Sequence, residues 1–130
     1  MLSGLLYTNM NTSGMLEKIL NDLKLLGGIE ASVVASRDGL LIYSNSALKQ
    51  NAETFAAMSA TMLGAAETAT AELGKGIPER IIVESVNGKI IATGAGPKAL
   101  LIVLTEPEAS LGLILIDVAK ASEKIKEAMG

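Results

Sequence analysis

The sequence predicts a single α+β domain, in which helices cover both faces of a five-stranded antiparallel sheet. Three observations lead to this fold class. Helical and strand-like segments follow one another in the order α-β-β-α-β-β-β-α. Two short turn signals, Asp38-Gly39 and Asn87-Gly88, each join two β-prone runs as a hairpin. The strand segments are apolar at most positions, which is typical of strands buried on both faces.

The first half of the chain begins with a helix over residues 12–26. Apolar side chains recur there at helical spacing, and Gly27-Gly28 supplies the C-terminal stop. Residues 1–11 are interpreted as an N-terminal tail that is either flexible or a short extra strand. Strands are expected at 29–36 and 40–45, with Asp38 as a turn residue between them.

A long helix is expected over residues 51–73, with Asn51 as its N-cap. One side carries the larger apolar residues, and Met58 and Met62 are interpreted as core residues. The other side is small and contains neither lysine nor arginine, which is unusual for a solvated helix of this length. Clustering of small residues by chance is one interpretation; the favoured one is a protein contact formed by Ala57, Thr61, Gly64 and Thr68.

The second half continues with strands at 78–86 and 89–95, a turn over Gly94–Pro97, and an almost wholly apolar central strand at 99–105. The last segment, 109–129, begins so apolar that its first part could be a strand. Its helical spacing favours one helix that is buried at its start.

Composition excludes several classes of function. The 130 residues contain no cysteine and no histidine, which removes disulfides, thiolate and imidazole catalysis, and the metal ligands of those side chains. A net charge of −3 disfavours binding to nucleic acid. We therefore expect no enzymatic activity, no cofactor, no metal and no nucleic-acid partner. Without a long apolar span or a basic start to the N-terminal segment, we also expect no membrane insertion and a cytoplasmic location.

Three features of the sequence could suggest a catalytic or ligand-binding role, but an ordinary structural role is favoured for each. Gly94–Lys98 superficially looks like a phosphate-binding loop, but Pro97 lacks an N–H group and a strand follows, so a plain turn is favoured. Arg37 at a hairpin tip is expected to be solvated, and Arg80 to pair with Glu84 across a dimer, rather than to act as an arginine finger. The carboxylates show no spacing typical of a metal site or an acid–base pair.

Taken together, the segments resemble a roadblock/LC7 domain of the MglB-like kind. Four stretches carry the resemblance: Gly28–Val34 running into Arg37–Ile42, the alanine-rich helix, Val86–Ile91, and Leu101–Thr105 with Leu111-Gly112-Leu113. It covers residues 12–129 as one domain. The resemblance implies a three-layer α-β-α sandwich of the profilin-like type with strand order 2-1-5-4-3. It also implies a homodimer formed by pairing of the third strands and contact of the central helices.

The resemblance further implies a regulator or scaffold that binds a Ras-like small GTPase. A structural adaptor dimer with no GTPase is the alternative, and an enzyme or small-molecule sensor is disfavoured by the composition. The residues expected at the dimer or partner interface come from the central helix and from the third strand, whose apolar edge needs a partner: Ala57, Thr61, Gly64, Thr68, Arg80, Ile82 and Glu84.

Overall fold

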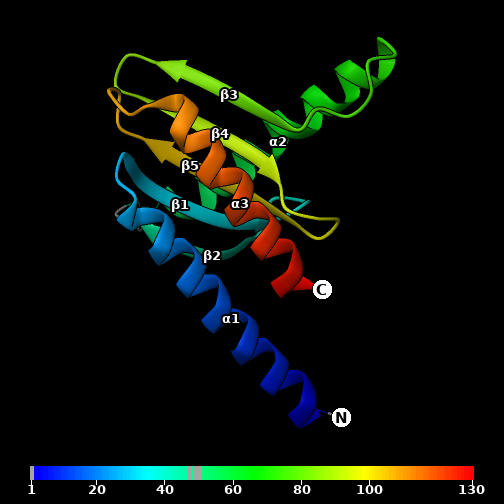
Figure 1. Ribbon diagram of the computed structural model, residues 1–130. Coiled ribbons are helices and arrows are strands. Elements are labelled where there is room, and N and C mark those ends of the chain that lie inside the picture. Colours follow the sequence, from blue (N-terminus) through cyan, green and yellow to red (C-terminus); the bar gives the residue numbers. More distant parts are fainter. Residues whose placement is uncertain (1, 47, 49–50) are drawn as a thin grey trace.

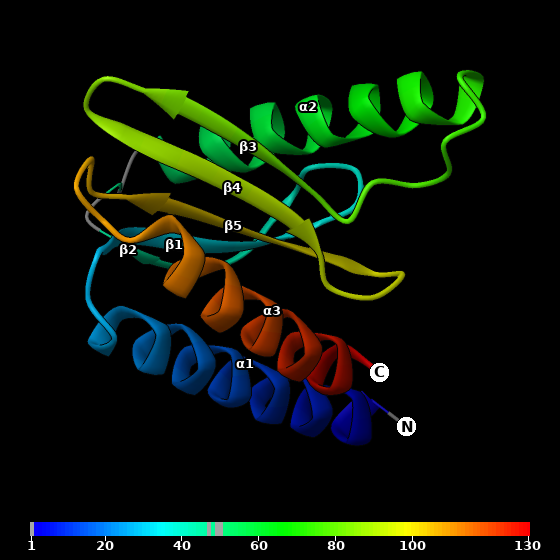
Figure 2. The same cartoon turned by 45° about the horizontal axis from the view of Figure 1, so that its top comes forward.

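The computed structural model describes residues 2–46, 48 and 51–130, with side chains from residue 11 onward except that of residue 46. It has three layers (Figures 1 and 2). Helices α1 (Leu2–Leu25) and α3 (Leu111–Met129) lie side by side on one face of the sheet, and α2 (Ala52–Glu72) lies on the other. This arrangement confirms the predicted fold class and element order.

The five strands are antiparallel and follow the order β2-β1-β5-β4-β3. Their bounds are Ile29–Ser36 for β1, Leu41–Ser46 for β2, Arg80–Ser85 for β3, Gly88–Gly94 for β4 and Ala99–Thr105 for β5. The apolar run 99–105 is the central strand, as predicted, and β3 lies at one edge. The segment 111–129 is helical throughout, which resolves its ambiguous apolar start in favour of a helix.

The first helix starts earlier than the sequence predicted. The backbone is helical from Leu2, so the tail expected over residues 1–11 is, apart from Met1, which lies outside the described residues, the first part of α1. The segment contains no proline, and a glycine inside a helix costs only about 1 kcal/mol relative to alanine. Gly4 and Gly14 therefore do not end the helix.

The second hairpin forms where expected, but its turn is shifted by one residue. Ser85 pairs with Gly88, so Val86 and Asn87 form the turn rather than Asn87 and Gly88. Gly88 does not have a positive φ. A Cβ atom on it would lie 2.6 Å from the carbonyl oxygen of Thr105, so close approach of the neighbouring strand explains the glycine.

The core consists of two clusters, one on each face of the sheet. The cluster under α1 and α3 contains large aliphatic side chains such as Leu16, Leu20 and Ile125. The cluster under α2 is built on the helix side from Ala56, Ala60 and Leu63, with the half-buried Phe55 packed against it. α2 is thus held by a thinner apolar contact than the helices on the opposite face. Asn51 occupies the N-cap position of α2 but forms no side-chain capping hydrogen bond.

Candidate interaction surface

The outward face of α2 is the most unusual surface of the fold. Seven positions at helical spacing are exposed, and six of them are small or apolar and uncharged. Glu72 is the exception, and no lysine or arginine lies on this face. The seven exposed positions are Thr54, Met58, Thr61, Ala65, Thr68, Ala69 and Glu72. A helix face of this composition, open to the surroundings, is typical of a protein contact.

The hydroxyl groups of the two threonines predicted on this face form hydrogen bonds within the helix. Thr61 Oγ1 donates to the Ala57 carbonyl oxygen at 2.9 Å, and Thr68 Oγ1 donates to the Gly64 carbonyl oxygen at 3.2 Å. The hydroxyl protons are therefore used within the helix, and the methyl groups are left for contact. Such a surface can be covered without leaving an unpaired donor.

None of the described residues packs closely against the position that a Gly64 side chain would occupy. A Cβ atom built on it meets no atom within 4 Å, and its φ is not positive. Neither a close neighbour nor a special backbone conformation accounts for glycine at this helical position. Close approach of a second molecule would account for it.

Ala57 and Met58 differ from the sequence-based expectation. Ala57 is half-buried because the β1–β2 turn packs beside it; a Cβ atom on Gly39 would lie 3.2 Å from Ala57 Cα. Met58, predicted to be in the core, is 55% exposed. Its position, two residues from the buried Ala56, turns it to the opposite side of the helix, so it is the largest apolar side chain of the outward face.

The three predicted residues of β3 lie along the edge of the sheet. Arg80, Ile82 and Glu84 alternate along the strand and share one face, opposite Thr93, Ile91 and Lys89 of β4. Ile82 is 38% exposed. Arg80 forms its described ion pair with the adjacent Glu79, at 3.3 Å. Pairing of Arg80 with Glu84 of a second copy stays a prediction.

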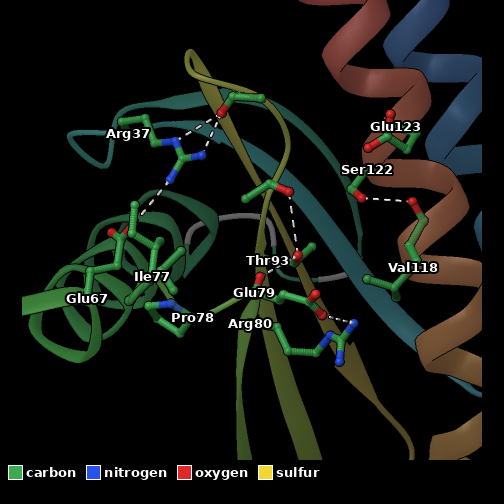
Figure 3. A pocket seen from close by; sticks show the side chains of 14 residues that line it. Arg37, Glu67, Ile77, Pro78, Glu79, Arg80, Thr93, Val118, Ser122 and Glu123 are labelled. Atoms are coloured by element: carbon green, nitrogen blue, oxygen red, sulfur yellow. Dashed lines mark hydrogen bonds and ion pairs between the residues drawn. The ribbon is translucent and has the colours of Figure 1, made fainter. Parts of the chain in front are cut away.

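A groove of about 650 Å³ opens between the start of β3, the end of β4, α2 and α3 (Figure 3). Both arginines of the chain line it, together with Glu67, Glu79 and Glu123. At its lower end, Thr93 Oγ1 donates to the carbonyl oxygen of Glu79 at 3.0 Å. The groove therefore carries both signs of charge and no excess of positive charge.

Arg37 is not the free hairpin charge that the sequence predicted. Its Nε and Nη2 atoms donate to the Gly96 carbonyl oxygen at 3.1 and 2.6 Å, and Nη1 lies 3.7 Å from Glu67 Oε2 (Figure 3). The side chain lies so close to Gly94 that a Cβ atom there would be 2.7 Å from Nη2. Arg37 thus joins the β1–β2 turn to the β4–β5 turn and to α2.

The Gly94–Lys98 segment is a turn, as predicted. Ala95 N–H donates to the Ala99 carbonyl oxygen at 2.9 Å, which closes the turn between β4 and β5. The Gly96 carbonyl oxygen is directed at Arg37. A phosphate cradle requires converging N–H donors, and this turn presents an acceptor.

In the part of the chain that the structure describes, no group of three or more acidic side chains is arranged to hold a metal ion. Likewise, none of the described helices is long and apolar enough to cross a membrane.

The chain and its fold correspond to a known class of protein. The model of the Roadblock/LC7 domain family matches residues 15–105. The uncharacterized protein MJ1340 of Methanocaldococcus jannaschii is 39% identical over 112 residues, which cover 86% of this chain and 97% of the relative. The chain belongs to the Roadblock/LC7 domain family.

Solved structures share the fold at low sequence identity. A structure described as MglB with a tetrameric arrangement superposes with a TM-score of 0.83 at 18% identity, covering 90% of this chain and 89% of the other. The gliding protein MglB of Thermus thermophilus gives a TM-score of 0.82 at 19% identity and covers 90% of each chain. Profilin II of Acanthamoeba castellanii is more distant, with a TM-score of 0.58 at 15% identity over 79% of this chain and 89% of its own. The fold is therefore MglB-like within the wider profilin-like group.

Proposed function

We propose that this protein is a homodimeric regulator or scaffold in the cytoplasm that binds a Ras-like small GTPase and has no catalytic chemistry of its own. The observation that carries the proposal is the outward face of α2, which is exposed, small and free of lysine and arginine. The edge strand β3 supports it, because an unpaired edge bearing an exposed isoleucine favours pairing with a second copy.

The described contacts of the arginines favour an indirect effect on the GTPase. Arg37 is committed to Gly96 and Glu67, and Arg80 is paired with Glu79. Donating either guanidinium to a bound nucleotide would require breaking these contacts. A regulator of this kind would act by preferring one conformation of the GTPase switch loops, which shifts their equilibrium.

Because both arginines already contact groups of this chain, a second candidate is a structural adaptor dimer without a GTPase. Such a dimer needs only the apolar contact surfaces and no mobile charge. The description of one MglB structure as a tetrameric arrangement is compatible with a family that builds assemblies.

The first test is the solution mass by light scattering at low and high protein concentration. We expect about twice 13.4 kDa at both concentrations. A monomer at both concentrations would contradict the proposed dimer and, with it, a regulator or scaffold that acts as a dimer. The dimer is then mixed with candidate small GTPases loaded with GDP or with a non-hydrolysable GTP analogue. Binding that depends on the nucleotide supports the regulator, and absence of binding across the set favours the adaptor.

A further inference from the structure

The seam between α1 and α3 ends in a group of exposed aliphatic side chains on the face opposite α2. Leu26 is 60% exposed and Leu113 is 65% exposed, and both line one groove of about 510 Å³. Leu25 and Ile116, on the outer sides of α1 and α3 near this end, are 84% and 54% exposed. Single exposed leucines are ordinary on a protein surface, but two that line one groove, with two more exposed aliphatic side chains near it, are typical of a contact site.

The rim of this groove is acidic. Glu106, Glu108 and Asp117 line it, and none of the lysines and arginines that the structure describes does. Lys89 Nζ donates to the Pro107 carbonyl oxygen at 3.1 Å, between the two glutamates, so one positive charge lies beside three negative ones and the rim stays acidic on balance. Negative charge before α3 stabilises the helix N-terminus, which accounts for Glu106 and Glu108 but not for Asp117, which lies within α3. It does not account for the exposed leucines beside them.

The groove is held in shape by short backbone contacts. The Glu106 N–H group donates to the Gly28 carbonyl oxygen at 2.9 Å, and Ala109 N–H donates to the Glu106 carbonyl oxygen at 3.2 Å. A Cβ atom on Gly28 would lie 2.9 Å from Ala109 Cβ, so the two walls are in close contact at its base. A preformed groove loses little conformational entropy when a ligand binds.

The groove also continues along the seam. A second, smaller hollow between the two helices shares Leu26 and Asp117 with it and extends toward Lys120 and Lys124. An elongated apolar hollow between two helices suits a third helix laid along it.

We propose that this groove binds a short amphipathic helix of a protein partner, with leucine-type side chains toward Leu26 and Leu113 and lysine or arginine toward Glu106, Glu108 and Asp117. The charge of the rim selects a basic segment, and the exposed aliphatic side chains select an apolar one. The site lies on the other side of the sheet from α2 (Figure 2), so it does not depend on the proposed dimer or GTPase contact. A dimer formed through β3 and α2 would carry two such sites.

The test uses two labelled synthetic peptides as probes and fluorescence anisotropy as the readout. One peptide is built from leucine and lysine at helical i, i+3, i+4 spacing, and its matched control replaces every lysine by glutamate. We expect the leucine–lysine peptide to bind the full-length protein, with affinity falling as salt is added, and the leucine–glutamate peptide not to bind.

Variants then locate the site. Leu113→Ser and Glu108→Lys should each weaken binding of the leucine–lysine peptide about tenfold. The matched controls away from the groove and from α2, Leu40→Ser and Glu127→Lys, change the same chemistry at exposed positions and should leave the affinity within about twofold. All four variants should keep the thermal midpoint and the solution mass of the parent protein. Equal loss in the groove variants and the controls, equal binding of both peptides, or no binding of the leucine–lysine peptide would each overturn the proposal.

Discussion

Arg37 connects three parts of the chain that are far apart in sequence. Its contacts to Gly96 and Glu67 join both turns at this end of the sheet to α2. Hydrogen bonds to a charged group contribute about 1.5–3 kcal/mol. The Arg37 side chain is 37% exposed, so we expect the lower side of this range or less, about 1 kcal/mol.

A double-mutant cycle tests this connection. Arg37→Ala should lower the free energy of unfolding by about 1 kcal/mol. Gly94→Ala should lower it by a similar amount, because the new Cβ would lie 2.7 Å from Nη2 and displace the guanidinium. In the Arg37→Ala background, Gly94→Ala should cost little. Urea unfolding of the four proteins measures the coupling.

Gly112→Ala is the matched control, since a Cβ atom there meets nothing within 4 Å. It should have the same effect with or without Arg37. Strictly additive effects of Arg37→Ala and Gly94→Ala would contradict the contact.

The hydroxyl of Tyr43 provides a second test at the scale of a residue. Desolvation by burial, and after it the negative charge of Glu17, raise the pKa of Tyr43 above its ordinary value of 10.0. In the Tyr7→Phe variant Tyr43 is the sole tyrosine, so absorbance at alkaline pH reports it alone. We expect a midpoint above that of a free tyrosine, and a lower midpoint when Glu17→Gln is added.

The sign of the pH effect on stability follows from this shift. Because the folded pKa is raised, the unfolded chain loses the Tyr43 proton first as pH increases. The contribution of the neutral side chain is complete below about pH 10, the ordinary tyrosine pKa, and is lost as pH rises through the folded pKa. A midpoint at or below that of free tyrosine would contradict the burial of this ring.

For single residues, the sequence predicted local turn roles better than long-range contacts and exposure. The turn role of Asp38 is confirmed, because its carboxylate accepts from the Ser36 hydroxyl within the β1–β2 turn. Arg37 is exposed, as expected, but its contact with Gly96 was missed, since that acceptor lies 59 residues away and carries no side-chain signal. Met58 was wrongly placed in the core because methionine is apolar, although helical spacing from Ala56 would have placed it outside.

At the scale of an element, α2 is the part of the fold whose substitutions should separate folding from binding. Gly64→Arg introduces a side chain where the chain itself leaves space, and arginine favours a helix over glycine by close to 1 kcal/mol. We expect the monomer fold to be retained and dimerisation or GTPase binding to be lost, measured by light scattering and pull-down. Normal assembly of this variant would remove α2 from the interface.

Gly64→Ala is the control for that experiment. It makes the same gain in helix propensity with a single methyl group. We expect assembly to be weakened far less than by arginine.

Elements were predicted well where their signals are local. Hydrophobic spacing and turn dipeptides are local, and the order of helices and strands is confirmed. The start of α1 was missed although Leu2, Leu5, Leu6 and Met10 already follow helical spacing, because the capping residues Thr12 and Ser13 favour a start at residue 12. The shift of the second turn could not be seen either, since Gly88 is required by the Thr105 carbonyl oxygen of another strand rather than by its own backbone angles.

At the scale of the whole molecule, the edge strand predicts a register for the dimer. If two β3 strands pair antiparallel about Ile82, then Arg80 of each copy lies opposite Glu84 of the other. Arg80→Glu alone and Glu84→Arg alone should each weaken the dimer, because two like-charge contacts replace two opposite-charge contacts. With up to about 1 kcal/mol for each exposed pair, we expect about tenfold or more in the dimer dissociation constant.

The combined Arg80→Glu, Glu84→Arg protein should recover most of the affinity, as measured by analytical ultracentrifugation. Failure to recover, with both single variants weakened, would place the symmetry axis at another residue of β3. Three unchanged dimers would remove β3 from the interface.

The larger arrangement was predictable from the sequence only in part. The antiparallel sheet follows from the two hairpins, and its strand order came from the family resemblance. The groove in Figure 3 was not predictable, because Arg37, Glu67, Glu79 and Ser122 belong to four separate segments that meet only in the folded chain. No periodicity or motif in the sequence indicates that these segments lie close together.

The unequal thickness of the two apolar layers has a consequence for motion. α2 is anchored by buried alanines, one buried leucine and the half-buried Phe55, whereas α1 and α3 are anchored by several fully buried larger aliphatic side chains. Local opening should therefore cost least at α2, and its amide hydrogens should exchange with solvent sooner than those of α3. The helix that is expected to meet partners is therefore also expected to be less protected than α3. Binding of a partner should then be detected first as slower amide hydrogen exchange along α2, even if the fold itself does not change.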